Sequence, residues 1–186
     1  STSGLENPLT HLLLAVFYAV YHRSGPRTVL WLSLLAALGA VNRLDAMVFF
    51  GPSLAYALWQ RLSVATLLDC GLGMMPLALW LLFSLFYYGF PFPNTAYAKL
   101  ATGVPLGDRL SLGVEYLYNS LRIDPITLAV VAAALVVAAV RRDRDALALA
   151  AGAACYLAYI VSIGGDVMSG RFFAAPFWCG VMLLFH

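Results

Sequence analysis

Long apolar runs, separated by short segments that carry almost all of the charge, constrain this chain more than any other feature. Residues 28–42, 46–60, 125–140 and 146–165 contain no charged side chain. Of the 186 residues, 62% are hydrophobic and 11% are charged, whereas about 25% of residues are charged in a soluble domain. The pattern predicts an all-α protein, a multi-pass bundle of transmembrane helices whose surroundings are the lipid bilayer.

Charge and cysteine content exclude two other classes of site. The net charge is only +2 and the basic residues are dispersed, so nothing indicates the clustered basic face of a nucleic-acid-binding protein. Cys70, Cys155 and Cys179 stand alone in apolar runs, without the spacing of metal ligands. We interpret them as inert buried thiols.

We expect about seven membrane helices in the 186 residues. The predicted spans are residues 8–21, a helical pair over 28–59, and single spans over 62–88, 126–140, 146–163 and 172–185. One straight helix over 28–59 would be ~48 Å long, more than a single crossing needs. The interruption from Asn42 to Asp45 therefore predicts a hinge; one tilted helix is the alternative.

Glycine and proline predict two further features of these helices. Gly71, Gly73 and Pro76 predict a kink in the span over 62–88. Pro125 predicts the start of a helix, because proline lacks only an N–H that the first turn does not use.

The basic turns predict the orientation. Six arginines in short connections are typical of cytoplasmic loops: Arg23, Arg27, Arg61, Arg141, Arg142 and Arg144. Helix alternation then places four polar segments on the extracytoplasmic face, namely residues 3–8, 42–45, 87–124 and 164–171. We expect 87–124 to be an extracytoplasmic loop within a single transmembrane domain over 1–186, with a helix at 106–121 lying on the membrane.

Two of these segments pair an acid with a base. In residues 164–171, three glycines permit close backbone approach, and Asp166 and Arg171 could anchor a polar ligand. Alternatively, these two residues pair with each other and cap two helices. Arg43 and Asp45 leave the same choice between a ligand site and a structural pair.

The other two segments supply further candidates. Glu6 precedes the first span, where a carboxylate also favours a helix N-terminus. In the long loop, Asn94, Tyr97 and Lys99 follow a Pro-Phe-Pro segment. Lys99 and Tyr97 could reach a phosphate or sugar hydroxyls, although an interfacial lysine also extends toward water without a ligand.

Four motifs, in order, carry a resemblance to a known family. They are Ser-Gly-Leu-Glu-Asn-Pro-Leu at 3–9, Asn-Arg-Leu-Asp at 42–45, residues 87–100, and Gly-Gly-Asp-Val-Met-Ser-Gly-Arg-Phe at 164–172. The chain resembles the GT-C superfamily of polytopic glycosyltransferases, and within it the actinobacterial arabinofuranosyltransferases of the cell wall. Because the chain starts without methionine and ends in an apolar run, we expect an internal fragment of such a membrane domain.

The resemblance implies an inverting sugar transfer at the outer face of a bacterial cytoplasmic membrane. The donor would be a polyprenyl-phosphate sugar, with arabinofuranose as one candidate, and the acceptor an extracytoplasmic glycan. The family's catalytic acid belongs to a loop expected upstream of Ser1, so the catalytic residue is unknown here. The motif at 42–45 departs from the Arg-Pro-Glu expected there, which leaves the role of Asp45 open.

Sugar transfer from a phosphate suggests a role for each candidate. Cations stabilise the departing phosphate, and Arg171, Lys99 and Arg43 are the candidates. The candidates for the sugar or acceptor are Asp166, Glu6, Asp45, Asn94, Tyr87, Tyr88 and Tyr97. No cofactor is certain, and a divalent metal ion on Asp166 stays an open alternative.

Two other classes of membrane protein fit the same composition. A transporter or flippase of lipid-linked substrates would also carry broken helices and charged groups near its substrate. A non-catalytic membrane scaffold needs only the apolar spans.

Overall fold

The computed structural model describes residues 6–23, 25–92, 97, 103–165 and 171–185, with the side chains of Glu6 and Arg171 excepted. All regular secondary structure in these residues is helical, which confirms the all-α prediction. Contacts between helices divide the chain into two compact units, Ser1–Tyr97 (unit 1) and Ala98–His186 (unit 2). The single domain over 1–186 stays a prediction.

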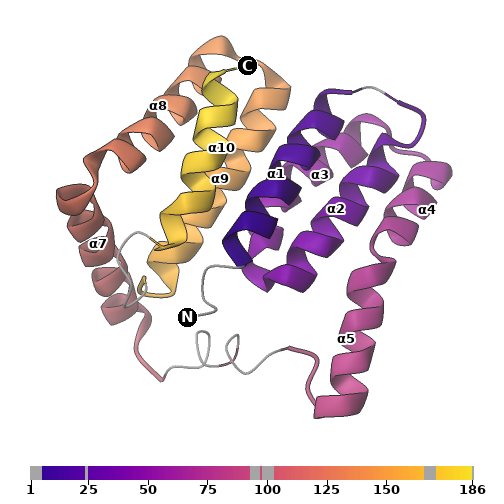
Figure 1. Cartoon of the computed structure of the whole chain (residues 1–186), viewed down its shortest axis with the longest axis horizontal. Coiled ribbons are helices and arrows are strands. Elements are labelled where there is room, and N and C mark those ends of the chain that lie inside the picture. Colours follow the sequence, from indigo (N-terminus) through magenta and orange to yellow (C-terminus); the bar gives the residue numbers. More distant parts are fainter. Residues whose placement is uncertain (1–5, 24, 93–96, 98–102, 166–170, 186) are drawn as a thin grey trace. The chain divides into compact units, whose positions relative to one another are not determined.

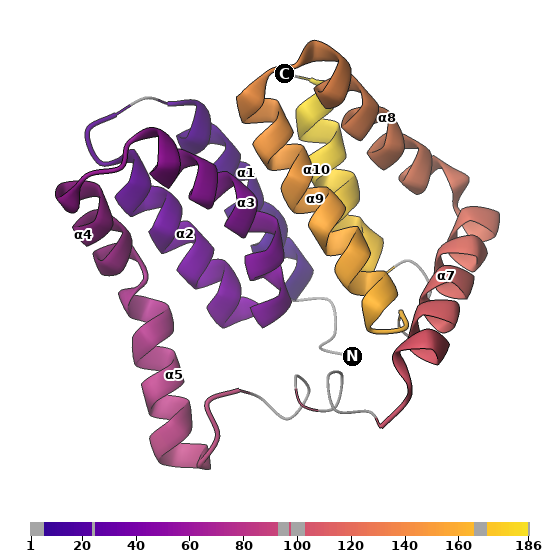
Figure 2. The ribbon, with the colours of Figure 1, turned by 180° about the vertical axis from the view of Figure 1, so that it is seen from behind.

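Unit 1 contains five α-helices and one 3-10 helix among its described residues. Its elements are α1 (Glu6–His22), α2 (Thr28–Asn42), the 3-10 helix η2 (Leu44–Ala46), α3 (Met47–Gln60), α4 (Val64–Gly73) and α5 (Met75–Tyr88). Figures 1 and 2 show α1, α2 and α3 side by side, with α4 and α5 following one another along a neighbouring side. The start of α1, the end of α2 and the end of α5 therefore lie toward the same end of the unit.

Helix α2 occupies the centre of unit 1. Its sequence is apolar on every side, and α1, α3, α4 and α5 all pack against it. Four of its apolar side chains are at most 1% exposed: Leu32, Ala36, Ala37 and Ala40. A helix that is hydrophobic all round is stable when its surroundings enclose it, and its neighbours supply much of that enclosure.

A contact between aromatic rings and a glycine joins α1, α2 and α3. The rings of Phe17 and Phe50 lie with their centroids 4.9 Å apart and are both buried. The Phe50 ring rests on Gly39 so closely that a Cβ at that position would overlap it. Gly39 thus lets the aromatic core of the unit reach the backbone of α2.

Both predicted interruptions in unit 1 are present. Arg43 adopts an extended conformation, with φ −150° and ψ 117°, and separates α2 from η2 and α3. This confirms the helical pair over 28–59 and excludes one tilted helix. Helices α4 and α5 are bent by 47° at Met74, which confirms the kink predicted from the nearby glycines and proline.

Unit 2 contains four α-helices and one 3-10 helix among its described residues. They are α7 (Leu106–Ile123), α8 (Pro125–Arg141), α9 (Arg144–Ser162), η3 (Arg171–Phe173) and α10 (Ala174–Leu184). Helix α10 packs against α8 and α9, and α7 packs mainly against α9. Figures 1 and 2 show α8, α9 and α10 as neighbours, with α7 continuing from α8 at a steep angle.

Helix α7 covers the helix predicted at 106–121 and buries one narrow face. Gly113, Tyr116 and Ser120 form that face, at helical spacings of three and four residues. Gly113 touches the backbone of Val161 in α9, and an added Cβ would lie 2.6 Å from the Val161 Cα. About half of the segment expected as a loop is therefore a helix packed on its neighbour.

The boundaries of α8 follow from local chemistry. Pro125 begins the helix, as predicted, and the Asp124 carboxylate accepts bonds from the Thr127 N–H (3.3 Å) and hydroxyl (2.6 Å). The Thr127 hydroxyl is the main cause that lowers the pKa of Asp124. Helices α7 and α8 meet here at a bend of 110°. At the other end, Arg142 takes a left-handed conformation with φ 53°.

About seven full membrane spans are not confirmed. Among the described residues, one helix, α9, is long and apolar enough to cross a bilayer. The number rises to three if each of two bent helix pairs counts as one span. One pair is α4 and α5, and the other is α7 and α8. The prediction counted apolar residues across helix breaks, whereas the extended Arg43 and the bends at Met74 and Asp124 divide those runs into helices of 10 to 18 residues.

Two glycines of α4 provide a matched test of the packing around α2. A Cβ on Gly73 would lie 2.6 Å from the Leu30 carbonyl oxygen and from the Ser33 Cβ, whereas Gly71 has open space. We expect Gly73→Ala to lower the free energy of unfolding by ~1–3 kcal/mol through overpacking. Gly71→Ala should leave it unchanged or raise it by up to ~1 kcal/mol. Unfolding of the purified protein in detergent measures both changes, and equal effects would contradict the packing.

Candidate functional site

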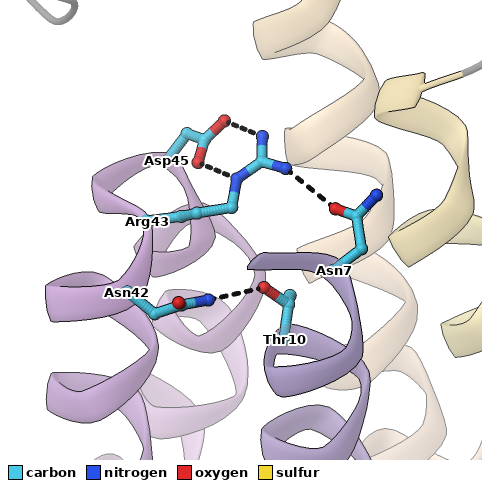
Figure 3. Close-up of polar contacts among 5 residues, drawn as sticks. All are labelled: Asn7, Thr10, Asn42, Arg43 and Asp45. Carbon is cyan, nitrogen blue, oxygen red and sulfur yellow. Dashed lines mark hydrogen bonds and ion pairs between the residues drawn. The ribbon is translucent and has the colours of Figure 1, made fainter. Parts of the chain in front are cut away.

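Five polar side chains gather at one end of unit 1 (Figure 3). They come from the start of α1, the end of α2 and the turn before α3, and we call them the polar cluster: Asn7, Thr10, Asn42, Arg43 and Asp45. Hydrogen bonds join two segments that the sequence separates by more than thirty residues. The cluster therefore unites the motif at 3–9 with the motif at 42–45.

Arg43 and Asp45 form a two-point ion pair. The Arg43 Nη2 lies 2.7 Å from the Asp45 Oδ2, and its Nε lies 3.1 Å from the Oδ1. The side chains are only 12% and 9% exposed. The extended backbone at Arg43 lets its side chain turn back toward a carboxylate two residues later. Two parallel bonds fix the guanidinium plane, which a single contact would leave free to rotate.

Two further bonds tie this hinge to α1. The Arg43 Nη1 donates to the Asn7 Oδ1 at 3.3 Å, and the Asn42 Nδ2 donates to the Thr10 Oγ1 at 3.0 Å. Thr10 is 4% exposed, so these bonds lie at the edge of the apolar interior. Buried polar groups need such partners because leaving water is otherwise costly. The cluster thus holds α1 and the hinge in one register.

Arg43 and Asp45 form the structural pair that was one of the two predicted alternatives. This pairing also affects whether Arg43 could bind a phosphate. Asp45 balances the charge of Arg43, so an approaching phosphate would meet a guanidinium that is already held by a carboxylate. A ligand role for Arg43 therefore requires Asp45 to orient the guanidinium while part of it contacts the ligand. Asp45 itself is occupied as a hydrogen-bond acceptor on both oxygens.

The described ring contacts of the predicted tyrosines of unit 1 are with other aromatic side chains and not with Arg43 or Asp45. Tyr87 and Tyr88 end α5, are 71% and 63% exposed, and contact each other with ring centroids 4.8 Å apart. Tyr97 packs against Phe90 and Phe92 at centroid distances of 6.0 and 6.2 Å. These rings form two aromatic groups with exposed tyrosines, available for stacking.

The side chains of the other predicted site residues lie outside the part of the chain that the structure describes. Lys99, Asn94 and Asp166 lie outside the described residues, and the metal alternative on Asp166 lies there with them. Glu6 begins α1 and Arg171 begins η3, but only their backbones are described. Within the described residues, no group of three His, Cys, Asp or Glu side chains could hold a metal ion.

The glycines at the start of the 164–171 segment adopt the predicted positive φ, and the close approach of Gly165 is to the Tyr116 side chain, whereas the approach to a ligand stays a prediction. Gly164 and Gly165 have φ values of 85° and 77°, and their N–H groups donate to carbonyls of Val161 and Ile160. A Cβ on Gly165 would lie 2.5 Å from the Cγ of Tyr116. Close backbone approach is thus used to seat this turn on α7.

A polar hollow of about 470 Å³ on α7 was missed by the sequence reasoning. Its polar walls are Glu115, Asn119 and Arg122, with Gly164 beside them. The Arg122 guanidinium lies 5.9 Å from the ring centre of Tyr118. The spacing of Glu115, Asn119 and Arg122 places all three on one helical face, and that spacing was the available signal.

Comparisons with models of protein families, with curated proteins and with solved structures found no match to this chain.

The ion pair gives a first testable consequence of the site. We expect Arg43→Met to lower the free energy of unfolding by about 2–4 kcal/mol, because Asp45 would be left nearly buried and unpaired. Arg61→Met, at an exposed arginine of the same unit, should change it by less than ~0.5 kcal/mol. Unfolding in detergent measures both variants.

A double-mutant cycle separates the pair from other effects of the substitution. With Asp45→Asn already in place, the further loss on Arg43→Met should shrink by at least ~1 kcal/mol. The same loss in both backgrounds would mean that the ion pair does not stabilise the hinge.

Proposed function

We propose that this chain belongs to a multi-pass membrane glycosyltransferase of the GT-C type. It would move a sugar, with arabinofuranose as the first candidate, from a polyprenyl-phosphate donor to a glycan acceptor. The reaction would take place at the extracytoplasmic face of a bacterial cytoplasmic membrane, and the seven-span topology is part of the proposal. The observation that carries it is the polar cluster, where two motifs of the family resemblance meet at one end of an apolar helical unit.

A membrane setting is supported by the surface of α5. Its buried residue is Ser84, whose hydroxyl donates to the Phe90 carbonyl at 2.9 Å. Large apolar side chains face outward, including Leu79, Phe83 and Phe86 at 57%, 56% and 87% exposure. Water disfavours so large an apolar surface, whereas lipid tails accept it and leave only the hydroxyl in need of a partner.

The proposed sugar transfer is a single displacement at the C1 atom of the sugar. The bond between the sugar C1 and the phosphate oxygen breaks, the phosphate keeps the electron pair, and the acceptor oxygen bonds to C1. A base takes the acceptor proton, and this base is expected upstream of Ser1. Cationic groups stabilise the charge that develops on the phosphate.

The proposed ligands follow from this step. Arg171, Lys99 and Arg43 would hold the phosphate, with Asp45 orienting the Arg43 guanidinium. Asp166, Glu6 and Asn94 would bind hydroxyls of the sugar or acceptor, and Tyr87, Tyr88 and Tyr97 would stack on sugar rings. An Mg²⁺ or Mn²⁺ ion on Asp166 is the metal alternative.

Transfer can be measured in proteoliposomes with a protein that includes the loop expected upstream of Ser1, where the catalytic residue is proposed to lie. The donor is a polyprenyl-phosphate arabinofuranose labelled in the sugar, and the acceptor is an arabinan oligosaccharide outside the vesicles. We expect Arg171→Ala to lower transfer at least ~100-fold through loss of phosphate stabilisation, with normal insertion. Arg141→Ala, at the last residue of α8, is the matched control and should leave transfer unchanged.

Each other outcome of this assay has a meaning. Normal transfer by Arg171→Ala would remove Arg171 from the site. Movement of the labelled lipid across the bilayer without transfer would replace the glycosyltransferase with a flippase. If the protein neither transfers the sugar nor moves the labelled lipid, the scaffold is favoured.

Orientation gives an independent prediction. In a background without the native cysteines, Lys99→Cys and Arg171→Cys should both react with a membrane-impermeant maleimide added outside intact cells. Arg142→Cys should react only after the membrane is opened, because its turn carries the cytoplasmic charge signature. Labelling of Lys99→Cys and Arg171→Cys from opposite sides would rule out one shared extracytoplasmic site.

A further inference from the structure

A second hollow in unit 2, of about 360 Å³, lies at the bend between α7 and α8 and is bordered by α10. We call it the elbow hollow. Three of its lining side chains are polar, namely Ser120, Asp124 and Thr127, and the others are Ile123, Leu128, Phe173, Ala174 and Phe177. No residue proposed above for sugar transfer lines it.

The polar side of the elbow hollow is rich in hydrogen-bond acceptors. The Asp124 carboxylate accepts two hydrogen bonds from Thr127, one from its N–H and one from its hydroxyl. The only hydrogen of that hydroxyl is therefore already donated. A carboxylate has about four acceptor sites and a hydroxyl has two, so both groups can accept further bonds from a ligand. Among the described side chains that line the hollow there is no lysine, arginine or histidine. The described lining therefore suits a ligand that donates hydrogen bonds.

Ser120 adds an unused hydrogen-bonding group. Its residue is 4% exposed, and its hydroxyl has no hydrogen-bond partner among the residues that the structure describes. A buried polar group without a partner is unfavourable in a folded protein. Because a serine side chain moves between staggered rotamers, a ligand in the hollow could take up this bond. Ser120 is thus poised to gain from a ligand with hydroxyl groups.

The apolar side of the elbow hollow is a fixed aromatic wall. Phe173 is 1% exposed and stacks on Tyr116, with ring centroids 5.3 Å apart and an angle of 22° between the ring planes. Tyr116 is in turn held against the backbone of Gly165. Phe177, one helical turn along α10, lines the same side. The C–H face of a sugar ring packs on such aromatic rings, while its hydroxyls point toward the polar side.

We propose that the elbow hollow binds a single neutral sugar ring. Its volume of about 360 Å³ leaves room for one monosaccharide. The acceptors of Asp124 and Thr127 would take hydrogen bonds from sugar hydroxyls, Ser120 would gain its missing bond, and Phe173 and Phe177 would cover the apolar face. The inference goes beyond the proposed function, since binding at this site requires no transfer.

Binding of free sugars to the purified protein in detergent tests the proposal. The probes are methyl α-arabinofuranoside and methyl α-glucopyranoside, followed by saturation-transfer NMR over a concentration series. We expect saturable binding of at least one probe. Ser120→Ala should weaken it about 5- to 10-fold through loss of one hydrogen bond, with a melting temperature equal to or above that of the unchanged protein.

A matched serine and a second variant make the result specific. Ser33→Ala removes another fully buried hydroxyl that has no partner among the described residues, but Ser33 does not line the hollow. It should leave sugar binding unchanged. Asp124→Asn keeps the side-chain shape and removes the charge, and it should weaken binding about tenfold, as expected for a charged hydrogen bond.

Four results would overturn the proposal. They are no saturable binding of either sugar, equal binding by Ser120→Ala and the unchanged protein, equal weakening by Ser33→Ala and Ser120→Ala, or tighter binding of tetramethylammonium than of the sugars. Because the binding assay contains no donor lipid, it is independent of transfer. A protein that binds sugar here but transfers none in the proteoliposome assay would contradict the proposed function and leave this inference standing.

Discussion

The enclosure of α2 is the requirement on which unit 1 depends. An α-helix that is apolar on every side is stable only when its surroundings cover it, and four helices of the unit pack against α2. Close packing requires small residues at the contacts, and Gly39 and Gly73 provide them against Phe50 and against the backbone near Leu30. The end of α2 then determines where the polar cluster can form, since Asn42 and Arg43 stand at the first point where the chain leaves this enclosure.

Local signals in the sequence predicted most breaks in the helices. The hinge at 42–45, the kink near Met74 and the start of α8 at Pro125 each follow from a residue that ends, bends or begins a helix by its own chemistry. The number of spans could not be obtained in this way. Hydropathy measures how apolar a segment is, whereas crossing a bilayer also depends on helix length and bending, and these depend on packing between helices.

The sequence predicted which segments of the candidate site come together, but not which side chains within them contact each other. The sequence indicated that the motifs at 3–9 and 42–45 share one end of the molecule, and the bonds from Arg43 to Asn7 and from Asn42 to Thr10 agree with that. It could not decide whether Arg43 and Asp45 pair with each other, because that depends on the backbone angles at Arg43. The hollows of unit 2 depend on how α7 lies against its neighbours. The helical spacing of Glu115, Asn119 and Arg122 indicates that they share a face of α7, but not that this face borders a hollow.

The left-handed conformation of Arg142 bears on the membrane topology proposed above. A residue other than glycine in this conformation carries a backbone penalty of roughly 1 kcal/mol, and glycine is the usual choice after a helix. Arginine at this position instead adds a third cation to the turn formed with Arg141 and Arg144. In a chain inserted during synthesis, such cations retain a loop on the side where translation occurs. Under the proposed membrane topology, Arg142 would exchange some stability of the finished fold for a more reliable direction of insertion.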